Sequence, residues 1–195
     1  FGHYRLQKLI GRGGMGEVYE AYDTRTDRRQ LRRLQGQRGG PSRKRGWHPI
    51  GLTLTELKFR MKISINTMPR EGSGHCATVG GVEAELGYGD ITVYVDKRYR
   101  KGSCQYRSVI EHENEHVAIF RSTLDRYAPR VEGRLTRAAE KLKPVAANTP
   151  NQAAERLQKA LQRQMKPLFK EMNRVLDSKN NGIDTAASYK REQAR

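Results

Sequence analysis

One stretch, SCQYRSVIEHENEHVAIF at residues 103–120, decides how the fold of this chain is interpreted. It contains the pattern H-E-x-x-H, formed by His112, Glu113 and His116. Residues four apart lie about one turn apart on the same face of an α-helix, so two imidazoles at this spacing can hold one Zn²⁺. Glu113 then stands beside a water on that metal. The stretch therefore predicts a helix that carries a zinc site, with Glu113 as general base.

The residues around the motif predict a long amphipathic helix. Apolar residues recur at steps of three and four, which is the period of a helix face. They are Tyr106, Val109, Ile110, Val117, Phe120, Leu124 and Tyr127. Ser103 is a plausible N-cap residue, and Pro129 is expected to end or kink the helix. The alternative is a solvated charged helix in which H-E-x-x-H occurs by chance.

The charge is high and unevenly distributed. The 195 residues carry 38 Lys and Arg against 21 Asp and Glu, a net charge of +17. Residues 24–46 have almost no apolar content and hold nine basic residues against one acid. Such a segment buries too little surface to offset the entropy of ordering, so we expect a disordered basic linker that makes non-specific anionic contacts. No apolar run is long enough to span a membrane.

Residues 1–23 contain a glycine-rich pattern, Gly11, Gly13 and Gly16 followed by Val18. The spacing G-x-G-x-x-G-x-V is that of a loop that covers phosphates. This segment resembles the opening of bacterial Ser/Thr protein kinases, and the resemblance implies two strands. The lysine, H-R-D and D-F-G elements of such a kinase are absent, so we expect a kinase-like remnant that binds no ATP.

The remainder, residues 47–195, is expected to be one domain of the α+β class. Strict alternation of apolar and polar residues predicts a strand at 57–65 and a hairpin at 82–95. A small antiparallel sheet would thus lead into the helix with the H-E-x-x-H motif. Thr149-Pro150 is typical of a helix start, and a second long amphipathic helix follows until Asn181-Gly182, with Pro167 as a possible bend.

The third zinc ligand is less defined than the histidines. The continuation H-x-x-G-x-x-H is absent, because Ile119 and Ser122 occupy the corresponding positions. We predict Glu171 as the third ligand, because it borders the apolar face of the second long helix. Asp184 and the other acids stay open as alternatives.

Two cysteines, Cys76 and Cys104, lie at the start of the second strand and of the motif helix. Without a C-x-x-C pattern they indicate a disulfide or two buried thiols, and we predict the disulfide. A zinc-thiolate role for Cys76, which follows His75, is the alternative.

With these residues in view, the chain from Trp47 to Tyr189 resembles a bacterial family of uncharacterised, predicted secreted zinc-dependent proteases. The resemblance rests on Cys76, on residues 91–96, and on the run from Gly102 into the motif. It implies a zincin-like fold, metallopeptidase activity and export, hence a periplasmic or secreted location. The chain departs from the family at its front, where the kinase-like segment stands in place of an export signal.

The expected function is therefore that of a zinc metallopeptidase acting on a protein or peptide. The edge strand of the sheet would hold the substrate in extended form. A rival interpretation is a basic module that binds nucleic acid or a membrane surface and whose metal site is not catalytic. No aromatic residue lies among the arginines of 24–46, so no specific nucleic-acid partner is expected.

Overall fold

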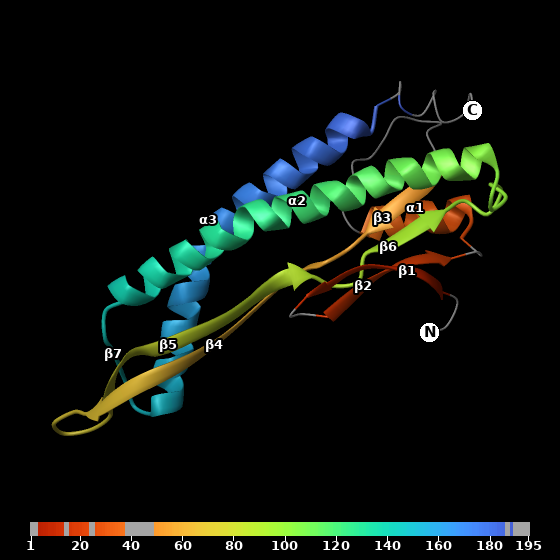
Figure 1. Ribbon diagram of the computed structural model, residues 1–195. Coiled ribbons are helices and arrows are strands. Elements are labelled where there is room, and N and C mark those ends of the chain that lie inside the picture. Colours follow the sequence, from red (N-terminus) through yellow and green to blue (C-terminus); the bar gives the residue numbers. More distant parts are fainter. Residues whose placement is uncertain (1–3, 14–15, 24–25, 38–48, 186–187, 189–195) are drawn as a thin grey trace. The chain divides into compact units, whose positions relative to one another are not determined.

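The computed structural model describes residues 4–13, 16–23, 26–37, 49–185 and 188 (Figure 1). The chain forms two compact units. The first comprises Phe1–Leu57, Tyr88–Arg121 and Ser178–Arg195, and the second comprises Lys58–Gly87 and Ser122–Asp177. Small antiparallel sheets are combined with long helices, which confirms the predicted α+β class.

The chain opens with a pair of strands. β1 (Tyr4–Gly13) and β2 (Gly16–Asp23) pair antiparallel, with Gly13 opposite Gly16. The two strands expected from the kinase-like opening are therefore present.

A helix, α1 (Arg28–Gln37), lies in the segment 24–46, for which the composition predicted a disordered linker. Asp27 caps this helix, because its Oδ1 accepts a hydrogen bond of 2.9 Å from a backbone N–H of the first turn. Leu31 is fully buried and anchors the helix. The prediction was wrong for these residues because a cap, the buried Leu31 and the partly buried Leu34 stabilise a helix that is otherwise mostly polar. Residues 38–46 lie outside the described part of the chain.

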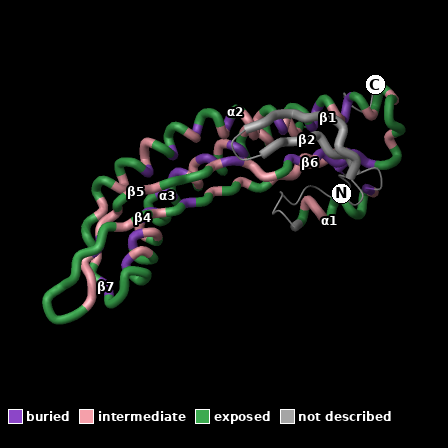
Figure 2. Tube along the Cα trace, turned by 60° about the horizontal axis from the view of Figure 1, so that its bottom comes forward, coloured by how far each residue is buried: buried purple, intermediate pink, exposed green. Residues whose placement is uncertain are grey.

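The strand predicted at 57–65 is present as β4 (Leu57–Pro69), and its side chains alternate between exposed and partly buried. β4 pairs with β5 (His75–Tyr88). The turn between them contains two glycines with positive φ, Gly72 and Gly74. β5 pairs along its other edge with β7 (Val145–Ala147), a short strand that the sequence pattern did not indicate. The tip of the β4–β5 ribbon is exposed (Figure 2).

The hairpin predicted for residues 82–95 is wrong. Both of its halves are strands, but β5 ends at Tyr88, and β6 (Thr92–Val95) pairs instead with β3 (Gly51–Leu54). After β5 the chain continues in the first unit, where the N–H of Gly89 donates to the carbonyl of Glu56 at 2.9 Å. Alternation identifies a strand, whereas the choice of partner depends on contacts distant in the sequence.

The helix with the H-E-x-x-H motif is α2 (Cys104–Lys141). Ser103 is its N-cap residue as predicted, because Ser103 Oγ accepts a hydrogen bond of 3.1 Å from the N–H of Tyr106. Pro129 does not end the helix, which continues for twelve residues beyond it. Apolar residues after Pro129, such as Val131 and Leu135, are buried, so packing outweighs the lost hydrogen bond.

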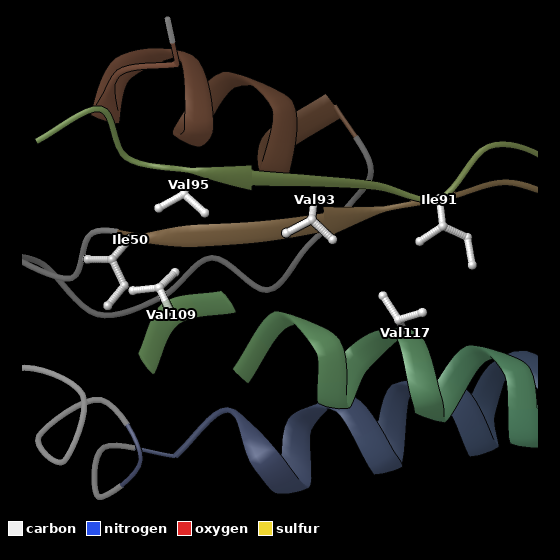
Figure 3. Packing of buried hydrophobic residues seen from close by; sticks show 6 residues of the cluster. All are labelled: Ile50, Ile91, Val93, Val95, Val109 and Val117. Carbon is white, nitrogen blue, oxygen red and sulfur yellow. The ribbon is translucent and has the colours of Figure 1, made fainter. Parts of the chain in front are cut away.

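The core of the first unit lies between α2 and the β3–β6 pair. Val109 and Val117 of α2 face aliphatic side chains from the strands and the segments beside them (Figure 3). The six buried members are Ile50, Ile91, Val93, Val95, Val109 and Val117. This packing fixes the position of α2 from Val109 to Val117. The H-E-x-x-H motif lies within these residues.

The second long helix is α3 (Pro150–Ile183). Thr149 is its N-cap residue as predicted, and it accepts a hydrogen bond of 3.3 Å from the N–H of Gln152. Its buried stripe consists of Ala153, Leu157, Leu161, Met165, Leu168, Met172 and Leu176. In the second unit, Phe169 of α3 packs on Phe59 of β4 with ring centroids 4.9 Å apart. Among the described residues, no helix is long and apolar enough to cross a membrane.

Candidate metal centre

The two histidines of the motif lie on one face of α2. His112 and His116 are one turn apart, their ring centroids are 5.0 Å apart, and the rings are nearly perpendicular. Their side chains are 6% and 11% exposed. The nearby Val109 and Val117 pack into the core of the first unit, which holds this face of α2 in place.

One carboxylate oxygen of Asp184 lies close to both histidine rings. Its Oδ1 lies 3.2 Å from Nε2 of His112 and 3.2 Å from Nε2 of His116. Asp184 directly follows α3, and its N–H donates to the carbonyl of Asn180 at 3.1 Å. The end of α3 therefore supplies a carboxylate that faces both imidazoles.

Asn180 holds the second ring from behind. Its Oδ1 lies 2.8 Å from Nδ1 of His116. An amide oxygen only accepts, so Nδ1 carries the proton of this hydrogen bond and Nε2 is directed at Asp184. A histidine that binds a metal is held in the same way, with one ring nitrogen bonded to a protein oxygen and the other facing the ion.

Without a metal, the ring of His116 favours a proton. Burial opposes its positive charge, but hydrogen bonds to Asp184 and Asn180 and the charge of Glu113 outweigh burial and raise the pKa of His116 to about 9. At neutral pH the Nε2–H of His116 therefore donates to Asp184. A divalent cation would neutralise the same carboxylates in place of this proton.

Glu113 faces strand β3. Its side chain is buried, and Oε2 accepts a hydrogen bond of 2.6 Å from the hydroxyl of Thr53. Gly51 leaves the room that the carboxylate needs, since a Cβ at this position would lie 2.4 Å from Glu113 Oε1. Burial raises the pKa of Glu113, although the two histidines and Thr53 favour its charged form.

The motif brings three potential ligand atoms together. One atom each of His112, Glu113 and His116 lie within 4.8 Å of one another, and Asp184 adds a further oxygen. Two imidazoles and a carboxylate form a common donor set of catalytic zinc sites. These donors fit a zinc ion, and the second carboxylate, that of Glu113, lies beside the two imidazoles.

Glu171, the third ligand predicted from sequence, has other partners. Its carboxylate accepts hydrogen bonds from the hydroxyl of Tyr127 at 2.9 Å and from the guanidinium of Arg130 at 2.8 and 3.2 Å. Tyr127 stands about three turns beyond His116 along α2. Among the described residues, the carboxylate that lies 3.2 Å from both imidazoles is that of Asp184, whereas Glu171 is bonded to Tyr127 and Arg130.

The predicted disulfide is absent, because Cys76 and Cys104 are both free. Cys76 belongs to the second unit, where it lies opposite Ala146 of β7. Cys104 belongs to the first unit and is exposed at the start of α2. Its Sγ accepts a hydrogen bond of 3.5 Å from the guanidinium of Arg107. The prediction rested on their positions at the starts of two elements, and the structure has no bond between the two thiols.

Sequence reasoning missed Gly51, Thr53 and Asn180 and left Asp184 as one acid among several. A signal for the last two exists, because Asn180 and Asp184 are four apart at the end of an amphipathic helix. That is the spacing of His112 and His116. Nothing in the residues 51–54 indicates a contact with the motif, because they form a strand too short for a clear alternation.

Comparisons with known proteins find a short likeness to kinases. A stretch of 28 residues, 14% of this chain, is 68% identical to the serine/threonine-protein kinase PknE of Mycobacterium tuberculosis (strain ATCC 25618 / H37Rv) and covers 5% of it. A match of the same length to PknD of the same strain is 71% identical and covers 4% of that kinase. No family model and no solved structure matches the chain. The likeness agrees with the kinase-like opening, and it spans only a small part of these kinases.

Proposed function

We propose that this protein is a zinc-dependent metallopeptidase. The observation that carries the proposal is the distance of 3.2 Å from Asp184 Oδ1 to Nε2 of both His112 and His116. Three donors of the kind that zinc takes in hydrolases thus meet at one point. A fourth position stays free of protein in catalytic sites of this type, and a structural site would fill it with another ligand.

Each residue of the site has a distinct role. His112, His116 and Asp184 would hold the ion, and Asn180 keeps the ring of His116 in the required tautomer. Zinc bound there lowers the pKa of a water to about 7 and polarises a carbonyl. Glu113 takes the proton of the attacking water and returns it to the leaving amine. Thr53 positions Glu113.

The substrate would lie along β3. Among the described strands, β3 pairs with β6 alone, so no described strand pairs with its second edge, along which an extended peptide would bind. Thr53 of β3 binds the carboxylate of Glu113, which places this edge beside the proton acceptor. Main-chain hydrogen bonds to such an edge would align the peptide bond that is cleaved.

The exchange Glu113→Gln separates a catalytic from a structural ion. Gln keeps the size of the side chain but accepts no proton. We expect an unchanged zinc content and melting temperature, and a loss of at least ~10²-fold in the hydrolysis of an unstructured protein. Glu115→Gln, an exposed acid on the same helix, is the matched control and should behave like the parent protein.

Two further variants complete this test. His112→Ala and His116→Ala should lose both zinc and hydrolysis. If Glu113→Gln keeps full activity, or if the purified protein takes up no zinc, the peptidase assignment is wrong. Zinc content by elemental analysis, thermal unfolding and turnover are measured on the same samples.

A further inference from the structure

Helix α3 carries a row of basic side chains on its exposed face. The row consists of Arg156, Lys159, Arg163, Lys166, Lys170 and Arg174, and all six are exposed. They follow one another at steps of three or four residues, so at 100° per residue they fall within an arc of about 80°. Because a helix rises 1.5 Å per residue, the row is about 27 Å long. We name it the basic row.

The opposite face of α3 holds the row in position. The seven buried residues of the helix, from Ala153 to Leu176, lie on the side away from the basic row and pack into the second unit. Phe169 packs on Phe59. The charged side chains are therefore carried by a helix that is anchored in the fold.

The outer members of the row have partners, and of these Arg156 donates to the backbone carbonyl of Ala146. Lys159 pairs with Glu155 across one turn, and Arg174 acts on Glu171, which is bonded to Arg130. Within the described part of the chain, no ion pair involves Arg163, Lys166 or Lys170. The centre of the row is therefore an uncompensated line of positive charge.

We propose that the basic row binds the phosphate backbone of double-stranded nucleic acid without sequence preference. A line one side chain wide matches a row of phosphates better than it matches the plane of a membrane. The apolar stripe of α3 is buried, so this helix does not present it to a bilayer. No aromatic side chain accompanies the row, which disfavours single strands. Exposed amides, Gln162 and Asn173, flank the row and can donate to phosphate oxygens.

This surface is distinct from the metal centre and does not depend on the proposed function. It also differs from the basic segment 24–46, for which anionic contacts were expected. Proteins that neutralise phosphates release counterions, so the logarithm of the binding constant falls with the logarithm of salt concentration by about 0.9 per contact. Six contacts would give a slope of about −5.

The test measures binding of the full chain to a random-sequence duplex of about two turns. Fluorescence anisotropy of the duplex gives the binding constant at each concentration of a salt series. The variant replaces the centre of the row by Arg163→Gln, Lys166→Gln and Lys170→Gln. The control carries the same charge change on the exposed face of β4, by Lys58→Gln, Arg60→Gln and Lys62→Gln. Circular dichroism and melting verify that both are folded.

We expect the parent and the β4 control to bind with a slope near −5, and the row variant to lose about three units of that slope. Equal losses in both variants would show that net charge alone attracts the duplex, which overturns the proposal. Binding to vesicles rich in phosphatidylserine but not to duplex would also overturn it, in favour of a lipid surface. If the parent protein does not bind the duplex at low salt, the proposal is also overturned.

Discussion

The hydroxyl of Thr53 donates a hydrogen bond of 2.6 Å to Oε2 of Glu113. The same hydroxyl lies 3.2 Å from the backbone carbonyl of Glu113. The short strand β3 is thereby joined to helix α2 at the residue proposed as general base. A glutamate beside two histidines has several rotamers, and this contact selects one of them.

Replacement of Thr53 should weaken both the fold and the reaction. Thr53→Val keeps the shape but leaves the buried Glu113 without this donor, a loss of about 1–3 kcal/mol. Thr53→Ser keeps the hydroxyl and should hydrolyse the substrate at a rate close to that of the parent protein. We expect Thr53→Val to lower kcat more than it raises KM. Equal activities of the Val and Ser variants would contradict a positioning role.

Gly51 should tolerate no side chain. A Cβ there would meet Oε1 of Glu113 at 2.4 Å and a methyl carbon of Val109 at 2.7 Å. Gly51→Ala must therefore shift the carboxylate or part β3 from α2, with a lower melting temperature and a large loss of hydrolysis. Gly36→Ala is the matched control, because nothing lies within 4 Å of a Cβ at this position in α1. A melt of Gly51→Ala equal to that of Gly36→Ala would show that the close approach is absent in solution.

The choice of the third ligand is tested by metal affinity. Asp184→Ala should weaken zinc binding by far more than tenfold, since it removes the oxygen that faces both Nε2 atoms. Glu171→Gln should leave the affinity unchanged, because that carboxylate is bonded to Tyr127 and Arg130. Calorimetric titration with zinc compares the two variants. The reverse order of affinities would restore Glu171 as ligand.

Local patterns predicted the elements of the fold better than their pairing. The period of three and four residues gave α2 and α3, and both N-cap residues, Ser103 and Thr149, are where the sequence indicates them. These signals depend on neighbours within one turn. The hairpin at 82–95 failed because the pairing of β6 with β3 joins segments about forty residues apart. Alternation carries no information about such distant partners.

The candidate site shows the same difference between local signals, which the sequence carries, and distant contacts, which it does not. His112, Glu113 and His116 are recognisable because the motif fits within one helix turn. The partners that define the geometry come from β3 and from the end of α3, about 60 to 70 residues away. Glu171 was chosen because it borders an apolar face, yet on that face the nearest cation, Arg130, binds it.

The last prediction concerns Asp96, which follows β6. Its side chain is 1% exposed, and its carboxylate accepts hydrogen bonds from the backbone N–H and from the guanidinium of Arg98. Arg28 of α1 approaches to 3.6 Å. Burial favours the neutral acid, but the contacts with Arg98 outweigh burial, so the pKa of Asp96 lies below its ordinary value of 3.8. The charged form is therefore the one that stabilises the fold.

The sign of the pH dependence follows. A lowered pKa contributes stability that is fully present above the unfolded value and is lost as the pH falls through the folded value. We expect Asp96→Asn to cost about 1.5–3 kcal/mol at pH 7, the range for hydrogen bonds to charged groups. The difference from the parent should shrink below about pH 4. Urea unfolding from pH 7 to pH 3 measures it, and Asp125→Asn, an exposed acid on α2, serves as control. A difference that stays constant down to pH 3 would show that Asp96 contributes packing and not charge.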